Sequence, residues 1–166
     1  MILGMTIAVA IAQCAVPPSE IKQILALSYE RFDMSSGKFG WRQLIGEGCT
    51  DAAVALIEHY HQVRSADLTL AQQSELSFHA AQALAFAGRG DAAITFLEHA
   101  QEYGGTDEWL TYVAGNLAFL RKDKAALLRA RDRYARIAPG SDRLQFLTGF
   151  LACPDAPYMA AAYCKP

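Results

Sequence analysis

Apolar residues recur along this chain at helical spacing, and no stretch alternates apolar and polar positions as a half-buried strand would. Capping residues begin the apolar stretches, and glycine or proline ends them, so the pattern predicts an all-α fold. We expect helices from Ser19 to about Phe32 and over residues 41–45, 51–64, 69–86, 91–103, 107–121, 123–138 and 142–152.

One helix-sized segment occurs twice. Residues 51–59 read DAAVALIEH and residues 91–99 read DAAITFLEH. A second similarity joins AQALAF at 81–86 to AGNLAF at 114–119, and an Ala-Ala pair follows each copy. Self-similarity at such intervals is typical of stacked helical repeats.

Helix pairs that recur at these intervals resemble tetratricopeptide repeats. In the pair over residues 69–103, the turn glycine of that family falls on Gly88. The small residue that opens the second helix falls on Ala93, and the small residue near its end falls on Ala100. Small side chains at these positions allow neighbouring helices to approach closely.

The next pair offers Ala126 as the small packing residue and Pro139 as the terminating proline, whereas Arg121 stands where the turn glycine is expected. The resemblance covers residues 41–139, although Gly40 interrupts the first helix of the first pair. It implies a right-handed stack of about three antiparallel helical hairpins, a TPR-like solenoid, plus a C-terminal helix.

In such a stack the first helix of each hairpin lines a concave binding face. The resemblance therefore implies a non-catalytic module that binds a protein or peptide. The alternatives are a structural subunit of a larger envelope assembly and, more remotely, a small helical hydrolase. Phe78 could equally be a core residue, with the others forming a solvated face. The residues expected to face the groove are Glu75, Phe78, Gln82, Glu108 and Thr111, together with Gly115.

The first twelve residues carry no charged side chain and end in Ala-Ile-Ala, which a signal peptidase could accept. We expect cleavage after Ala12, a periplasmic or secreted protein, and one mature domain over residues 19–166. The segment is too short to span a bilayer. The usual Lys or Arg before the apolar stretch is missing, so a misassigned start site and an apolar first helix are two alternatives. A lipid anchor on Cys14 is a third, although Gln13 disfavours lipidation because a small residue normally precedes the lipidated cysteine.

Four cysteines remain after such cleavage, and an even number in an exported chain favours disulfides. Cys153 and Cys164 flank a short segment whose turn could bring them together, which leaves Cys14 for Cys49. No pair has the Cys-x-x-Cys spacing of a structural zinc site.

Charge and polar chemistry exclude several classes of function. Fifteen basic and seventeen acidic residues give a net charge of −2, so we expect no nucleic-acid partner. The arginines at 129, 131, 133 and 136 lie at helical spacing and predict a solvated helix face.

No catalytic or metal site is predicted. His59 and His61 point to different faces of one helix, His59 and His99 are explained by the repeat, and His79 is interpreted as an ordinary, partly buried histidine. A nucleophile with a base, a carboxylate pair or a phosphate loop would indicate an enzyme, and none is recognisable in the sequence. We therefore expect no catalytic residue, no metal ligand and no cofactor.

Overall fold

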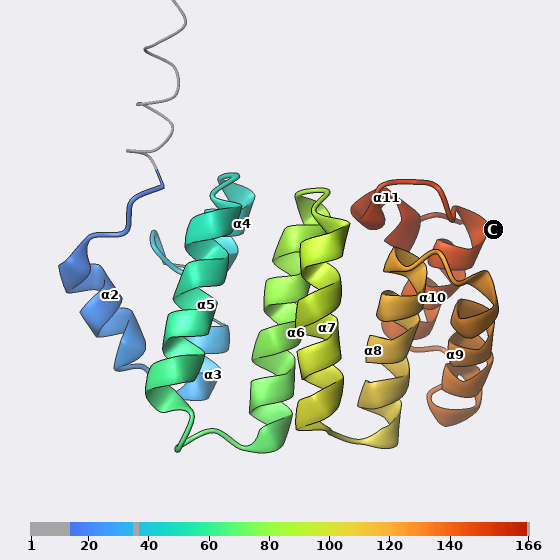
Figure 1. The fold of residues 1–166 in the computed structure, drawn as a ribbon, viewed down its shortest axis with the longest axis horizontal. Helices are drawn as coiled ribbons and strands as arrows, with labels where there is room; N and C mark the ends of the chain where they lie inside the picture. Colours follow the sequence, from blue (N-terminus) through green and yellow to red (C-terminus); the bar gives the residue numbers. More distant parts are fainter. Residues whose placement is uncertain (1–13, 35–36, 166) are drawn as a thin grey trace, which may run out of the picture. The chain divides into compact units, whose positions relative to one another are not determined.

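The structure, a computed structural model, describes residues 14–34 and 37–165. Within these residues the chain forms ten α-helices and no strand, which confirms the predicted all-α class (Figure 1). The proposed export segment, residues 1–12, lies outside the described residues and stays a prediction. The contacts group into two compact units that divide between Asp67 and Leu68, and each unit is described separately below.

The first unit is built around one long helix. Phe32 and Tyr60 stack with ring centroids 3.7 Å apart, and both are buried together with Leu44 and Ile57. These side chains form a small apolar core, which is what holds the shorter helices against α5. The helices of this unit are α2 (Pro18–Leu25), α3 (Tyr29–Asp33), α4 (Trp41–Gly46) and α5 (Thr50–Arg64).

The prediction of a single helix from Ser19 to Phe32 is wrong, because α2 ends at Leu25 and α3 begins only at Tyr29. The Leu27 carbonyl accepts hydrogen bonds from the Tyr60 hydroxyl at 2.9 Å and from Arg64 Nη1 at 3.1 Å. Ser28 then caps α3 as its N-cap residue. The carbonyl of a continuous helix would be used within the helix, so these bonds to α5 favour the break.

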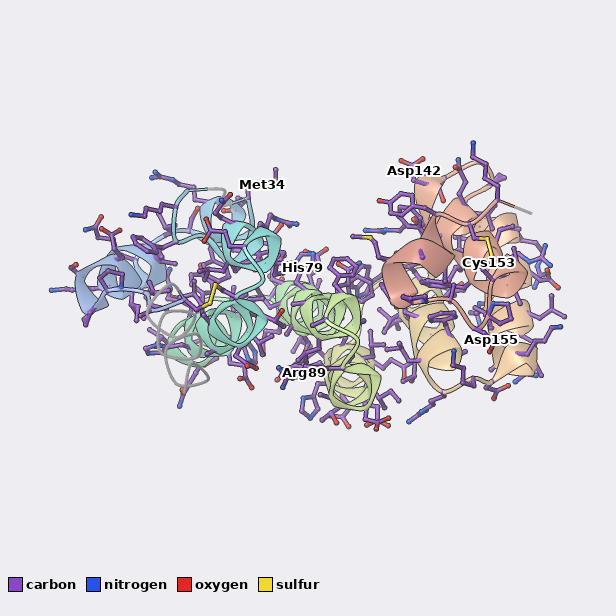
Figure 2. All side chains as sticks on the ribbon, turned by 90° about the horizontal axis from the view of Figure 1, so that it is seen from above. Met34, His79, Arg89, Asp142, Cys153 and Asp155 are labelled. Carbon is purple, nitrogen blue, oxygen red and sulfur yellow. A yellow bond between two sulfur atoms is a disulfide. The ribbon has the colours of Figure 1, made fainter. Side chains whose placement is uncertain are left out.

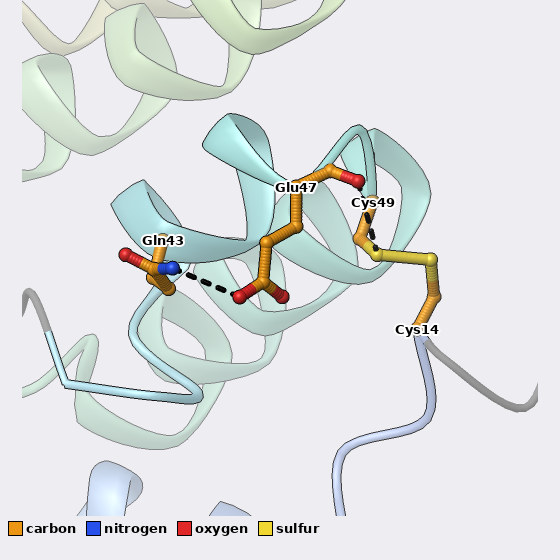
Figure 3. Close-up of a disulfide and its surroundings, with 4 residues drawn as sticks. All are labelled: Cys14, Gln43, Glu47 and Cys49. Atoms are coloured by element: carbon orange, nitrogen blue, oxygen red, sulfur yellow. Dashed lines mark hydrogen bonds between the residues drawn. A yellow bond between two sulfur atoms is a disulfide. The ribbon is translucent and has the colours of Figure 1, made fainter.

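A disulfide joins Cys14 to Cys49 in this unit, with Cα atoms 5.3 Å apart (Figure 3). Nearby, Gln43 Nε2 donates a hydrogen bond to Glu47 Oε1 at 2.8 Å, at the turn between α4 and α5. The disulfide ties the segment before α2 to the start of α5, and the cysteine pattern predicted this pairing.

The second unit consists of six helices that pack mainly with their neighbours in sequence. The most extensive packing is between α6 and α7, between α8 and α9, and between α7 and α8, while α10 packs on both α11 and α9. Residues 69 and 72 form the predicted capping box at the start of α6. The helices are α6 (Leu70–Phe86), α7 (Gly90–Tyr103), α8 (Asp107–Leu120), α9 (Lys124–Ile137), α10 (Asp142–Ala152) and α11 (Tyr158–Ala162).

The turns within the α6–α7 and α8–α9 pairs have the same hydrogen bonds. The Gly88 N–H donates to the Ala85 carbonyl at 3.0 Å, and the Lys122 N–H donates to the Phe119 carbonyl at 3.0 Å. Both Gly88 (φ 74°) and Lys122 (φ 58°) have left-handed backbone. Lys122 therefore takes the turn position that the sequence pattern assigned to Arg121. The two pairs are related by the interval from Gly88 to Lys122, which is one residue longer than the sequence suggested.

This register changes one predicted packing residue. Ala93 and Ala100 are fully buried, as expected for small residues at a close helix contact. Their equivalents in the next pair are Leu127 and Tyr134, which are also buried. Ala126 is only half-buried and lines a surface groove, so the packing position of α9 belongs to Leu127.

The segment between the last two cysteines, predicted only as a turn, contains α11. A disulfide joins Cys153 to Cys164, with Cα atoms 6.2 Å apart, and Figure 2 shows it as a yellow bond beside Cys153. Gly149 of α10 is packed closely beneath α11, because a Cβ atom there would lie 2.5 Å from the Ala161 carbonyl oxygen. The second predicted disulfide therefore holds a short helix against α10.

Candidate functional site

Of the residues predicted to line a binding groove, Phe78 lies in the core of the second unit. Its ring is 3% exposed and packs with centroids 4.9 Å from Trp109 and 5.4 Å from Tyr112. These contacts join α6 to α8 through aromatic side chains. Phe78 is thus a packing residue in this structure.

Gln82 belongs to a chain of polar groups inside the second unit. Its side chain lies near the Tyr158 hydroxyl, which donates a hydrogen bond to Asn116 Oδ1. Asn116 Nδ2 in turn donates to the Tyr112 carbonyl at 2.8 Å. Burial raises the pKa of Tyr158 well above its usual value, because the phenolate would be desolvated there.

Glu108 takes part in a second polar cluster. Its carboxylate accepts a hydrogen bond from the Tyr134 hydroxyl at 2.7 Å and lies 3.8 Å from Arg143 Nη1. The Arg143 guanidinium also lies over the Trp109 and Tyr112 rings, 5.1 and 5.3 Å from their centroids. Glu108 is therefore engaged with α9 and α10.

Gly115 and Glu75 complete the predicted set. A Cβ atom at Gly115 would lie 2.4 Å from Leu147 Cδ2, so the glycine permits close packing of α8 against α10. Glu75 is half-buried on α6. The structure thus distributes the predicted residues among several environments, and their role in ligand binding stays a prediction.

Thr111, the remaining predicted residue, lies in a surface groove between α8 and α9. The groove has a volume of about 590 Å³, and we call it the α8–α9 groove. Each helix contributes four residues at spacings of three, one and three, which place them on one helical face. They are Asp107, Leu110, Thr111 and Ala114 from α8, with Ala126, Arg129, Ala130 and Arg133 from α9.

The walls of the α8–α9 groove carry charge, and its floor is mainly apolar. Arg133 forms an ion pair with Asp107 across the opening. Arg129 is exposed, and no hydrogen-bond or ion-pair partner reaches it within residues 14–34 and 37–165. The Thr111 side chain is nearly buried, with 6% of the residue exposed. The groove therefore offers a free guanidinium above a surface of alanine and leucine.

Sequence reasoning placed Arg129 and Arg133 on a solvated helix face and missed the groove. A pattern pointing to it is present, because Ala126 and Ala130 precede the two arginines by three residues each and lie beside them. That pattern does not reveal which helix lies opposite. Only the packing of α8 on α9 shows that the small residues leave an open groove.

The second unit has another cavity of about 620 Å³, between α10 and the residues that follow α11. Phe146 and Tyr163 meet edge to face there, with centroids 5.2 Å apart. The described residues contain no group of three or more His, Cys, Asp or Glu side chains that could hold a metal ion.

No protein-family model, curated protein or solved structure matches this chain. The resemblance to tetratricopeptide repeats therefore rests on residue pattern and spacing. Among the helices formed by the described residues, none is both long and apolar enough to cross a membrane.

Proposed function

We propose that this protein is a non-catalytic helical-repeat module of the cell envelope that binds a peptide segment of a partner protein. The observation that carries the proposal is the α8–α9 groove, which combines an apolar floor with a free guanidinium. Binding sites for small groups are typically concave, mostly apolar and supplied with a few polar side chains.

Repeated geometry supports the helical-repeat part of the proposal. The turn with left-handed Gly88 recurs at Lys122, and Gly48 of the α4–α5 turn has the same conformation (φ 78°). Moreover, Gly115 and Gly149 are related by the same interval as Gly88 and Lys122, and each permits close packing of another helix, α10 on Gly115 and α11 on Gly149. A stack of similar hairpins would produce such equivalent positions.

The envelope part of the proposal is supported by the cysteines and the first residues. Both predicted disulfide pairs, Cys14 with Cys49 and Cys153 with Cys164, are formed in the structure. Disulfides persist in oxidising compartments such as the periplasm or the extracellular space. The apolar segment over residues 1–12 supplies a route of export.

Photocrosslinking tests whether the α8–α9 groove contacts a partner. A photoreactive phenylalanine analogue would replace Leu110, which lines the groove, and in a control protein Met159, which is 46% exposed on α11. Irradiation of the native host's envelope should join one partner protein to the Leu110 variant and not to the Met159 variant. Mass spectrometry should then map the crosslink to one short segment of that partner.

Two outcomes would contradict the proposal. Absence of any crosslink from the Leu110 position, while both variants fold and are exported, would remove the groove as a binding site. Crosslinks of similar yield from both positions would instead indicate a subunit that is buried on several faces in a larger assembly.

A further inference from the structure

We infer that the ligand of the α8–α9 groove is an acidic, amphipathic peptide segment. A carboxylate of this segment would pair with Arg129, and its apolar side chains would cover the alanine and leucine floor. This inference rests on the proposed function and adds the chemistry of the partner.

Charge distribution is the first reason. Helix α9 contains five of the fifteen basic residues of the chain and one of its seventeen acidic residues. The rest of the chain therefore has ten basic and sixteen acidic residues and is acidic overall. A positive helix on an acidic protein attracts an anionic partner to that helix in particular.

The state of the individual groups is the second reason. Arg129 is exposed and has no partner among the described residues, so its charge is available to a ligand. Asp107 is the one acidic residue lining the groove, and its charge is offset by Arg133. The planar guanidinium of arginine can bind a carboxylate through two parallel hydrogen bonds, which gives direction as well as attraction.

The floor of the groove selects between anionic partners. Leu110, Ala114, Ala126 and Ala130 present apolar surface beside the two arginines. A peptide supplies both carboxylates and apolar side chains, whereas an acidic polysaccharide leaves the apolar floor uncovered.

Fluorescence anisotropy with a defined probe tests the inference. The probe is a labelled peptide of repeating Glu-Glu-Leu units, and its counterpart has glutamine in place of every glutamate. We expect the acidic probe to bind the full chain and the glutamine probe to bind at least tenfold more weakly. Binding of the acidic probe should weaken as salt is added, since exposed charges are screened.

The matched variants are Arg129→Thr and Lys165→Thr. Thr95 occupies the position equivalent to Arg129 in α7, so threonine is already accommodated at this place in the repeat. Arg129→Thr should weaken binding of the acidic probe roughly tenfold, the effect of about one charge-assisted pair. Lys165→Thr removes an exposed positive charge elsewhere and should leave the affinity within twofold.

Several results would overturn the inference. Equal affinity of the two probes, or no change in affinity with Arg129→Thr, would exclude acidic recognition in this groove. Equal loss of affinity with Lys165→Thr would indicate attraction to the whole surface. Tight binding of polygalacturonate, an acidic polysaccharide, with no binding of the peptide would identify the other class of partner. If the Leu110 crosslink persists in any of these cases, peptide binding stands and only its acidic chemistry fails.

Discussion

The α6–α7 and α8–α9 pairs have the same turn geometry and differ in the side chains that they display. Their turns have the same hydrogen bonds, and Gly88 and Lys122 both adopt left-handed backbone. The exposed residues at equivalent positions are nevertheless of different charge. Helix α7 carries Thr95, His99 and Glu102 where α9 carries Arg129, Arg133 and Arg136. The comparison shows that two helical pairs with the same turn can display surfaces of different charge.

The buried contacts of the two pairs differ in a related way. In the α6–α7 pair, Ser74 donates a hydrogen bond to the Ala100 carbonyl at 2.6 Å and accepts one from Trp109 Nε1 of α8 at 2.7 Å. One pair further along the chain, the positions of Ser74, Ala100 and Trp109 are occupied by Glu108, Tyr134 and Arg143. A small uncharged cluster is thus replaced by a larger charged one. Residues at the same three equivalent positions are in contact in both clusters.

The largest expected effect concerns the packing position that follows from aligning Gly88 with Lys122. Leu127 is 2% exposed, so Leu127→Ala should lower the free energy of unfolding by about 2–5 kcal/mol through loss of burial and formation of a cavity. Ala93→Leu gives α7 the residue that α9 has at the equivalent position, and it should cost about 1–3 kcal/mol by overpacking. Urea denaturation would measure both changes.

Ala126→Gly provides a control for the alternative register at the same helix. If Ala126 were the packing residue, as the alignment of Gly88 with Arg121 suggested, Leu127→Ala would be nearly neutral. A larger effect at Ala126 than at Leu127 would therefore show that the register is wrong.

Alkaline pH should weaken the second unit through Tyr112. Burial raises the pKa of Tyr112 to about 12, against an ordinary value of 10, and hydrogen bonding to Asn116 opposes the shift only in part. Below pH 10 the group is protonated in both states. Between pH 10 and 12 the unfolded chain loses the proton and the folded chain keeps it, so stability should fall by on the order of 2–3 kcal/mol.

Urea melts of the wild-type protein and of Tyr112→Phe, at several pH values between 9 and about 12, would measure this contribution. Other buried tyrosines contribute to both proteins, so the difference between them isolates Tyr112. An equally steep loss of stability in Tyr112→Phe would contradict the assignment.

Ser74→Ala tests the uncharged cluster of Ser74, Ala100 and Trp109. The substitution would leave Trp109 Nε1 without its acceptor in a buried site, and we expect a loss of about 1–3 kcal/mol. Ser77→Ala, on the same helix and half-buried, should change stability by less than about 0.5 kcal/mol. Thermal melts would compare the two variants, and equal effects would show that the Trp109 contact is unimportant.

The smallest effects are expected at the turns. Gly88→Ala should cost about 1 kcal/mol, because alanine disfavours φ 74° although the space around it is open. Lys122→Gly should be nearly neutral, since easier left-handed backbone offsets the lost hydrogen bond from Lys122 Nζ to the Pro154 carbonyl at 2.7 Å. A large stabilisation by Lys122→Gly would mean that the lysine contacts contribute little.

Local sequence determined most of the helices and both disulfides. Apolar spacing and caps predicted α6 and α10 to within about a residue, including the Thr69 capping box, because these signals act within a few neighbouring residues. The cysteine spacing likewise left few ways to pair, and the structure contains the predicted pairs.

The tertiary structure decided what depends on distant residues. Tyr60 and Arg64 break the helix predicted over residues 19–32 by bonding the Leu27 carbonyl. Lys122 adopts the left-handed turn with contacts to the Phe119 ring and the Pro154 carbonyl, which a repeat comparison of the sequence misplaced by one residue. Helical spacing shows which side chains share a face but not what lies opposite, so only the packing of α8 on α9 could reveal an open groove beside Arg129.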